Sequence, residues 1–491
     1  MSIETLIKRL QNIMRGDDLA GTVQYLKQMI WMIFLKIYDA KEEEWELLDD
    51  NYQSIIPDRL KWRNWAVDNN DGKALTGDEL IKFVNNDLID TLKKLEVDEN
   101  TPKKHLIVKQ IFEDASNLMK NGVKLRQMIN ALNEIDFTNY TEAHEFGDMY
   151  ESMLKDLQES KRDGGEFYTP RALTDFIVEK VDPRLGESVA DFACGTGGFL
   201  VSALKHMESN VHTPEDQELC RSALYGIEKK SFPYSLCLTN LILHDVEEPR
   251  VYYGNSLTRN VRDYQESDLF DVIVMNPPYG GTEDVTVQSN FPADYRASET
   301  ADLFMAVIMY RLKTNGRCGV VLPDGFLFGT DGAKRNLKEK LLNEFNLHTV
   351  LRLPKSVFAP YTSIATNVLF FDKDQDGTKD VWFYRMDMPT GMKAFSKTKP
   401  IRLEHFDPVR EWWNNRSEMQ DEDGNFKSKK YTKEELAATN YDLDLCGYPH
   451  KVEEVLEPDV LINQYFEKKA SLDESIKDVL GKIMALLEKD E

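Results

Sequence analysis

Apolar residues recur every three or four positions through roughly the first 140 residues of the chain. The clearest run forms one apolar face from Val23, Leu26, Ile30, Trp31, Phe34, Leu35 and Tyr38. This spacing is typical of an amphipathic α-helix. Further along, Thr101-Pro102 has the composition of a helix start, with apolar residues at helical spacing behind it. The pattern predicts an all-helical N-terminal domain over residues 1–145.

From about residue 150 the pattern changes, and short β-branched runs alternate with helical segments. The expected strands are Glu187–Phe192, Ala223–Ile227, Val251–Tyr253, Phe270–Met275, Arg317–Leu322, His348–Leu353 and Ile364–Phe371. The expected helices between them include Leu173–Lys180, Gly198–His206, Ser231–Leu243 and Asp302–Lys313. This alternation is typical of an α/β fold, a mostly parallel sheet with helices on both faces. We therefore predict an α/β domain over residues 146–410 that binds its ligands beyond the carboxyl ends of the strands.

After about residue 400 we expect no further strands. Residues 414–430 are polar and charged, and they are interpreted as a loop or linker. A strong helical pattern follows, with one apolar stripe made by Ile462, Phe466, Leu472, Ile476, Val479, Leu480, Ile483 and Leu487. A helix of this kind packs either on its own domain or on a helix of a partner protein. Residues 411–491 are thus expected to be a linker and a helical partner-binding region.

The composition fits a folded protein of several domains. The 491 residues allow about three domains, and 24 Phe, 20 Tyr and 7 Trp are too many for a disordered chain. No apolar run reaches the ~20 residues that span a bilayer, and the N-terminus lacks a signal-peptide pattern, so we expect a cytoplasmic protein without a membrane segment. Five widely spaced cysteines and eight scattered histidines predict neither a disulfide framework nor a metal site.

The charge balance argues against unaided nucleic-acid binding. The chain has 61 Lys and Arg against 85 Asp and Glu, a net charge of −24. The acidic excess is spread along the whole chain, and no segment is strongly basic. A protein that binds DNA by itself usually carries a basic face. If this chain handles DNA, it needs local basic loops and a partner that supplies the remaining contacts.

A glycine-rich loop follows the first expected strand of the α/β domain. The loop runs Asp191-Phe192-Ala193-Cys194-Gly195-Thr196-Gly197-Gly198 and opens a helix. Glycines there permit a tight turn and close approach of the backbone to a ligand. Glu228 ends the next expected strand, where a carboxylate can accept hydrogen bonds from a ribose diol. Together the loop and Glu228 indicate a nucleoside-type ligand.

A second segment, Asn276-Pro277-Pro278-Tyr279, directly follows the strand Phe270–Met275. The two prolines fix the backbone and remove two N–H donors, which leaves carbonyl oxygens as acceptors. The side-chain oxygen of Asn276 adds another acceptor. Two acceptors can hold both hydrogens of an amino group, while Tyr279 can stack on a planar ring beside it. The segment is therefore a candidate site for an amine or amide substrate.

These two motifs, in this order, resemble the gamma group of N6-adenine DNA methyltransferases, which use S-adenosylmethionine. A third segment, Gly165–Arg171 (GEFYTPR), is similar to the family's stretch that closes over the methionine part of the cofactor. The resemblance implies a Rossmann-like methyltransferase domain, with Asn276, Pro277, Pro278 and Tyr279 as catalytic residues. It implies cofactor contacts from Glu166, Phe167, Tyr168, Thr169, Pro170, Arg171, Asp191, Gly195, Thr196, Gly197, Gly198, Glu228 and Asn255.

The chain resembles most closely one subfamily, the modification (HsdM-type) subunits of type I restriction–modification systems. Segments similar to that subfamily are Tyr234–His244, Leu322–Gly325 and Leu353–Phe370, and a helical domain precedes the catalytic one there too. The resemblance implies double-stranded DNA as substrate, a specificity subunit that binds two modification subunits, and a motor–nuclease restriction subunit as a further partner. The terminal helix is similar to the segment that meets the specificity subunit.

On this resemblance, the methyl group passes from the sulfonium of S-adenosylmethionine to N6 of a flipped-out adenine. Asn276 and the carbonyl of Pro277 hold the amino hydrogens, Tyr279 stacks on the base, and Phe358 or Tyr361 forms the other wall. Alternatives stay open: a solitary DNA methyltransferase, a protein glutamine methyltransferase, because the Asn276 segment suits any planar amide or amine, or a non-catalytic scaffold.

Overall fold

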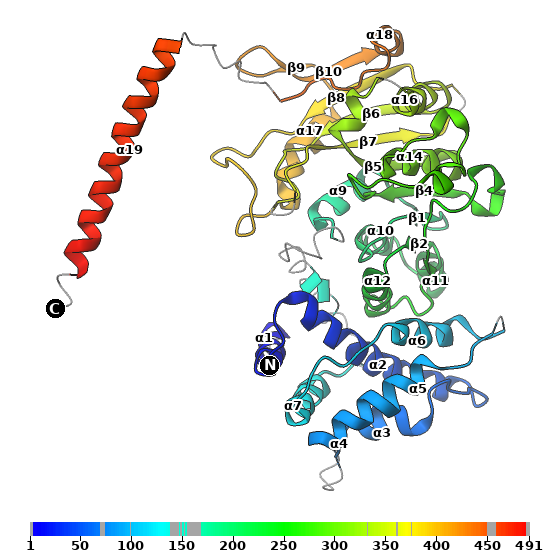
Figure 1. Ribbon diagram of the computed structural model, residues 1–491. Helices are drawn as coiled ribbons and strands as arrows, with labels where there is room; N and C mark the ends of the chain where they lie inside the picture. The colour runs from blue at the N-terminus through cyan, green and yellow to red at the C-terminus, as the bar shows by residue number, and fades with distance from the viewer. Residues whose placement is uncertain are drawn as a thin grey trace. The chain divides into compact units, whose positions relative to one another are not determined.

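The computed structural model describes residues 3–68, 74–98, 100–137, 147, 150–151, 153–154, 168–330, 332–359, 362–374, 376–448 and 458–487. Met1–Gly447 and Tyr448–Glu491 are two separate compact units, and each is described by itself. Figure 1 shows the first unit as a helical layer next to a sheet that is covered by helices. Among the described helices, none combines the length and the apolar character that a membrane span needs.

The N-terminal region is helical, as predicted. Its helices are α1 (Ile3–Arg15), α2 (Thr22–Leu48), α3 (Trp62–Trp65), α4 (Gly77–Lys82), α5 (Asp90–Lys93), α6 (Lys103–Glu113) and α7 (Gly122–Asn133), and a π-helical turn, Phe83–Ile89, joins α4 to α5. The long helix α2 is buried on nearly all sides between residues 25 and 38 because α6 and the later helix α12 both pack against it. The helical layer therefore packs against the α/β domain through α2, α6 and α12.

The strands of the described residues form one ten-stranded sheet in the order β3-β2-β1-β4-β5-β7-β6-β8-β10-β9. They are β1 (Val189–Asp191), β2 (Leu224–Glu228), β3 (Val251–Tyr253), β4 (Phe270–Met275), β5 (Leu312–Pro323), β6 (Asn346–Arg352), β7 (Thr366–Asp372), β8 (Asp380–Arg385), β9 (Met419–Gln420) and β10 (Phe426–Thr432). The half from β3 to β5 is parallel, whereas β7 runs antiparallel between β5 and β6. The sheet is thus mostly parallel, as predicted, with antiparallel pairing only where β7 or β10 takes part among the described strands.

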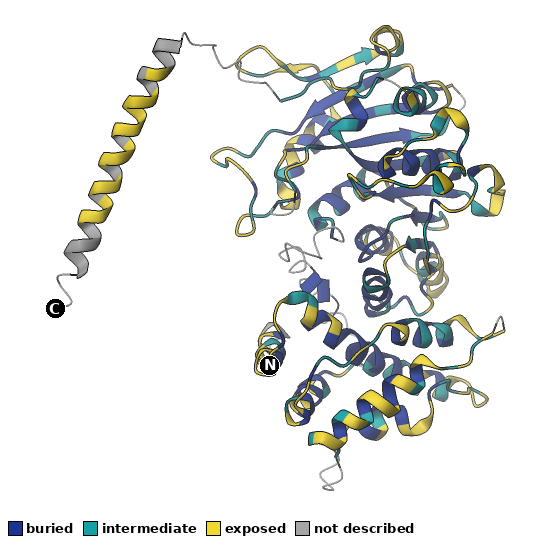
Figure 2. Ribbon diagram, viewed as in Figure 1, coloured by how far each residue is buried: buried dark blue, intermediate teal, exposed yellow. Residues whose placement is uncertain are grey.

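Helices cover both faces of the sheet (Figures 1 and 2). They are α9 (Arg171–Val181), α10 (Gly198–Glu208), α11 (Pro214–Ser222), α12 (Ser231–Leu243), α13 (Val285–Gln288), α14 (Thr300–Arg311), α15 (Asp324–Phe328), α16 (Gly332–Glu344), α17 (Asp407–Asn414) and α18 (Lys433–Ala438). Successive side chains of a strand point to opposite faces. In β4, Val272 and Val274 therefore join the core under α9, α10 and α12, while Ile273 and Met275 join the core under α14 and α16. The burial of both faces explains the unbroken apolar run of β4.

Residues 414–430 differ from the sequence-based interpretation. The expected loop or linker contains β9 and most of β10, which extend the sheet through antiparallel pairing of β10 with β8. The expectation that strands end near residue 400 was wrong. β10 has the sequence FKSKKYT, and its lysines are half-buried or exposed. Charged residues of this kind are common near a sheet edge, where they discourage pairing with other chains.

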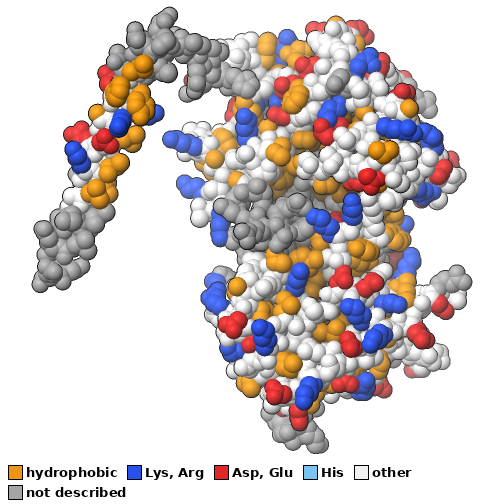
Figure 3. All heavy atoms as spheres, viewed as in Figure 1, with side chains coloured by type: hydrophobic (Ala, Val, Ile, Leu, Met, Phe, Trp, Pro, Cys, Tyr) orange, Lys and Arg blue, Asp and Glu red, His pale blue; other side chains and the backbone are white. Residues whose placement is uncertain are grey.

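The second unit contains one long helix, α19 (Pro458–Leu487). Seven apolar side chains along it are between 51% and 63% exposed: Ile462, Tyr465, Phe466, Leu472, Ile476, Val479 and Leu480. Figure 3 shows apolar side chains gathered along this helix, with charged side chains among them. The predicted amphipathic helix is therefore present.

Candidate functional site

One cavity of about 450 Å³ lies at the carboxyl ends of β1, β2 and β4. Both predicted motifs contribute to its wall, the glycine-rich loop after β1 and the Asn276 segment after β4. Strands β1 and β4 are parallel neighbours, with Ala190 paired to Ile273, so the two loops leave the sheet side by side. Sites for small molecules typically enclose about 300–1,000 Å³. The cavity is therefore large enough for a nucleoside-type ligand.

The glycine-rich loop turns sharply from β1 into α10. Gly195 and Gly197 have φ angles of 54° and 82°, in the left-handed region that favours glycine. Gly198 begins α10, and a Cβ atom there would lie 1.7 Å from Nη1 of Arg171. A side chain at position 198 would therefore push the loop away from α9. These glycines hold the loop backbone close to the cavity.

Two buried carboxyl groups stand at the ends of β1 and β2. Asp191 accepts a hydrogen bond from the backbone N–H of Ala193 (3.0 Å), and burial raises the pKa of Asp191 to about 8. Glu228 accepts hydrogen bonds from the backbone N–H groups of Gly195 (2.9 Å) and Lys230 (2.8 Å). Burial raises the pKa of Glu228, and these N–H groups offset part of that effect. Each oxygen of Glu228 keeps a second lone pair that can accept from a ligand hydroxyl.

Asn276 lies where β4 leaves the sheet, and its carboxamide is bonded at both ends. Its Nδ2 donates to Oγ1 of Thr169 (3.1 Å), and its Oδ1 accepts from the hydroxyl of Tyr279. Burial holds the pKa of Tyr279 above its ordinary value, so its hydroxyl stays protonated as a donor. The ring of Tyr279 contacts that of Phe358 edge-on, with centroids 6.2 Å apart. Asn276, Tyr279 and Phe358 thus form one contiguous cluster.

A buried polar network that the sequence did not indicate lies beneath the glycine-rich loop. Arg171 donates to both carboxylate oxygens of Glu151, and Asn240 of α12 donates to Glu151 and to the carbonyl oxygen of Thr196 (3.0 Å). Burial by itself would raise the pKa of Glu151, but the charge of Arg171 and these hydrogen bonds outweigh it and lower the pKa. The network links α9 and α12 to the loop.

Most of the predicted site residues adjoin this cavity. Those on its wall are Thr169, Asp191, Gly195, Thr196, Gly198, Glu228, Asn255, Asn276 and Pro278. Five further predicted residues are next to these wall residues in the sequence: Tyr168, Pro170, Gly197, Pro277 and Tyr279. Arg171 packs against the ring of Tyr168 (4.9 Å to the centroid). Glu166, Phe167 and Tyr361 lie outside the described residues.

Other wall residues were not predicted. Thr300 and Phe304 come from α14, and Thr282 and Glu283 come from the loop after the Asn276 segment. The start of that loop folds back on the cavity, where the backbone N–H of Thr300 donates to the carbonyl oxygen of Gly281 (3.0 Å). The four unpredicted wall residues are of types that are ordinary in a helix or loop, so only the tertiary structure identifies them as part of the site.

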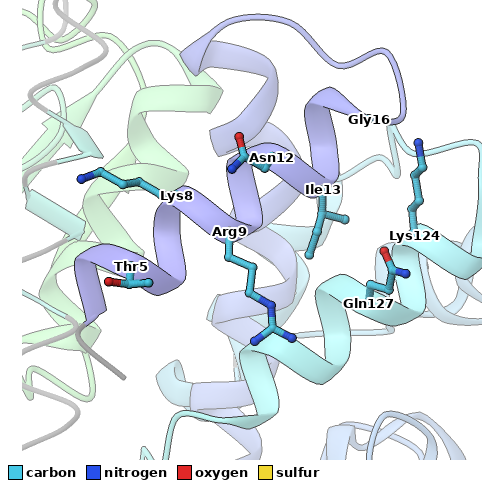
Figure 4. Close-up of a pocket in the computed structure, with 8 residues that line it drawn as sticks. All are labelled: Thr5, Lys8, Arg9, Asn12, Ile13, Gly16, Lys124 and Gln127. Atoms are coloured by element: carbon cyan, nitrogen blue, oxygen red, sulfur yellow. The ribbon is translucent and has the colours of Figure 1, made fainter.

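A second hollow, about 510 Å³, lies between α1 and α7 (Figure 4). It is lined by Thr5, Lys8, Arg9, Asn12, Ile13, Gly16, Lys124 and Gln127. Most of these side chains are exposed, and Arg9 forms an ion pair with Glu134 (2.6 Å). This second hollow lacks the buried carboxyl and amide groups that line the cavity at the carboxyl ends of the strands.

Within the described residues, no group of His, Cys, Asp or Glu is arranged to hold a metal ion.

Comparisons with known proteins match the helical N-terminal region and the α/β region to two separate families. Residues 3–132 match the HsdM N-terminal domain, and residues 141–456 match the N-6 DNA methylase family. The chain is 47% identical to the type I restriction enzyme EcoEI methylase subunit of Escherichia coli, with 99% of each chain covered.

Two solved structures share the fold over almost the whole chain. A modification subunit of a putative type I restriction enzyme from Vibrio vulnificus YJ016 has a TM-score of 0.78 and 39% identity, covering 93% of this chain and 98% of its own. A chain from a study of complex assembly and conformational transition in the type I R-M system has a TM-score of 0.82 and 36% identity, covering 100% and 99%. This chain belongs to the N-6 DNA methylase family, as a methylase subunit of a type I restriction–modification system.

Proposed function

We propose that this chain transfers the methyl group of S-adenosylmethionine to N6 of a flipped-out adenine in double-stranded DNA. It acts in a complex with a specificity subunit that selects the target sequence. The observation that carries the proposal is that the glycine-rich loop, Glu228 and Asn276 all line the same cavity at the carboxyl ends of the strands. A cofactor site and an amine-binding site that adjoin in this way can bring a methyl donor and its acceptor into contact.

The residues around the glycine-rich loop fit S-adenosylmethionine. Among the described residues, Oγ1 of Thr196 and Nη1 of Arg171 are buried without a hydrogen-bond partner, which is costly unless a ligand supplies one. The carboxylate of the methionine moiety would accept hydrogen bonds from both Oγ1 of Thr196 and Nη1 of Arg171. Asp191 would face the ammonium group, and Glu228 would accept from the ribose hydroxyls. Asn255, also on the wall, would lie near the adenine moiety.

The cofactor supplies a methyl group bound to a positively charged sulfur, an electrophile that needs no activation by a metal. The chain's own residues have to hold the acceptor nitrogen. Oδ1 of Asn276 and the carbonyl oxygen of Pro277 accept hydrogen bonds from the two N–H groups of the adenine amine, so the lone pair of the amine nitrogen points toward the cofactor. With the cofactor bound, the N–CH₃ bond would form as the S–CH₃ bond breaks, the bonding pair staying on sulfur, and the methylated amine would then lose one proton to water.

Tyr279 and Phe358 fit the walls of a base pocket. In the structure the hydroxyl of Tyr279 occupies Oδ1 of Asn276, the atom that would accept from the adenine amine. The incoming amine therefore has to replace this hydroxyl, after which the ring of Tyr279 can stack on the base. Stacking of a base on an aromatic ring is worth about 1–3 kcal/mol, which offsets part of the cost of flipping the base.

The specificity subunit is proposed to bind α19. A net charge of −24 and the absence of a strongly basic segment in the sequence disfavour DNA binding by this chain unaided. The exposed apolar stripe of α19 suits a partner helix better than it suits solvent. The resemblance to HsdM-type subunits supports two copies of this chain for each specificity subunit, with a restriction subunit as a further partner.

Methylation of DNA by the assembled complex tests the proposal. The chain and its specificity subunit are incubated with methyl-labelled S-adenosylmethionine and duplex DNA, and the DNA is digested to nucleosides. We expect N6-methyladenine, and none without the specificity subunit. Label in another nucleoside, or in glutamine of an added protein, would refute adenine as the acceptor. Equal methylation by the chain without a specificity subunit would instead favour a solitary enzyme.

A further inference from the structure

Thr169 contacts the catalytic amide rather than only the cofactor side of the cavity. Its Oγ1 accepts the hydrogen bond from Nδ2 of Asn276 at 3.1 Å, although the two residues are 107 positions apart in the chain. Thr169 also lines the cavity. The sequence predicts Thr169 as a cofactor contact, and this hydrogen bond gives its hydroxyl a second role.

Both partners of this hydrogen bond are attached to rigid backbone. Thr169 precedes Pro170, and a residue before proline is restricted to extended conformations. Pro170 in turn caps α9, whose first residue, Arg171, is held by Glu151. Asn276 is fixed between the buried strand β4 and Pro277. The two side chains therefore meet with little freedom to separate.

The two ends of an asparagine side chain have opposite hydrogen-bonding character. Its oxygen accepts, whereas its NH₂ group donates and would repel the amine of the target base. Only one orientation of the Asn276 carboxamide can bind the amine. In that orientation the NH₂ group must find an acceptor elsewhere, because a donor that is shielded from water and left unpaired is costly.

We propose that Thr169 is a positioning residue for methyl transfer: its hydroxyl accepts from Nδ2 of Asn276 and holds Oδ1 toward the target base. This inference rests on the proposed function. The other partner of the carboxamide, the hydroxyl of Tyr279, has to leave Oδ1 when the amine binds. The contact with Thr169 can persist through binding and transfer, so it keeps the amide oriented during the reaction.

Substitutions at position 169 in the full complex test the inference. Thr169→Val keeps the shape but removes the acceptor, and Thr169→Ser keeps the hydroxyl. At saturating S-adenosylmethionine, we expect Thr169→Val to lower kcat roughly 10- to 100-fold, with KM for DNA within about twofold of wild type. Thr169→Ser should restore most of the loss. Thr169→Ala removes the same hydroxyl and replaces the Val variant if that variant does not bind the cofactor.

Two results would overturn the inference. One is an unchanged kcat in both variants that lack the hydroxyl. The other is weaker cofactor binding with full kcat at saturating cofactor, which would make Thr169 only a cofactor ligand. If the wild-type complex itself transferred no methyl group to adenine, the proposed function would fail instead, so the two failures are distinguishable.

Discussion

The cavity at the carboxyl ends of β1, β2 and β4 and the helix α19 differ in what their side chains contact. Around the cavity, Asp191 and Glu228 accept from loop backbone N–H groups, and Arg171 is held by Glu151, all within this chain. Along α19, seven apolar side chains are more than half exposed. A region whose charged groups are held mainly by its own chain can be assembled before a partner protein binds, whereas an exposed apolar stripe needs a partner protein to cover it. The chemistry is thus expected to reside in this chain and the choice of target in its partner.

Replacing Asn276 by alanine should separate the two regions most strongly. The substitution removes the proposed acceptor for the target amine, so methyl transfer should fall by at least about 100- to 1,000-fold. Cofactor binding and assembly with the specificity subunit should persist. Label transfer, calorimetry and size-exclusion chromatography measure the three properties. Asn414→Ala, at an exposed position, is the control, and undiminished transfer by the Asn276 variant would contradict the role of its side chain.

Glu228→Ala should damage the cavity without affecting α19. The carboxylate accepts from two backbone N–H groups that shape the loop and is proposed to accept from the ribose hydroxyls. Hydrogen bonds to a charged group contribute about 1.5–3 kcal/mol, so Kd for S-adenosylmethionine should rise roughly 10- to 100-fold. Titration calorimetry measures this change. Loss of complex formation in the same variant would show that the two regions are not independent.

Acidic substitutions on α19 should produce the opposite pattern. Ile476→Asp together with Leu480→Asp places charges in the apolar stripe, and we expect affinity for the specificity subunit to fall at least about tenfold. Kd for S-adenosylmethionine should not change. Lys477→Ala, on the same helix between these positions, is the matched control. Normal assembly of the double variant would reject α19 as the contact surface.

The pH dependence of stability should show a smaller effect, which tests whether the buried Asp191 beside the cavity is protonated. Burial raises the pKa of Asp191 from its ordinary value of 3.8 to about 8. Between these two pH values the Asp191 carboxyl is therefore protonated in the folded protein and ionised in the unfolded chain. The Asp191 contribution to stability therefore falls as pH rises toward 8. Asp191→Asn should remove this fall, so its gain in melting temperature over wild type should be larger at pH 8.5 than at pH 6.

Thermal unfolding of the cofactor-free protein across this range measures the effect. Asp263→Asn, at an exposed position, is the control and should show no such trend. An equal melting-temperature difference between Asp191→Asn and wild type at both pH values would contradict a buried, protonated Asp191.

The sequence predicts the local features well and the tertiary ones poorly. β3 and β4 have the predicted bounds. For β4 this is because both of its faces are buried, which requires an unbroken apolar run. β10 was missed because the sheet end carries lysines in place of an apolar pattern, and the antiparallel direction of β7 has no signature in its composition. The glycine-rich loop and the Asn276 segment are contiguous motifs. Glu151 and Asn240 belong to the site only because helices distant in sequence pack beneath the loop.

The central claim is that one cavity holds the methyl donor and the target amine at the same time. A structure of the complex with a stable analogue of S-adenosylmethionine and duplex target DNA tests it most directly. We expect an everted adenine whose N6 lies about 2.7–3.2 Å from Oδ1 of Asn276 and from the carbonyl oxygen of Pro277, facing the analogue in the glycine-rich loop. An adenine that stays in the helix, or one bound away from Asn276, would contradict it.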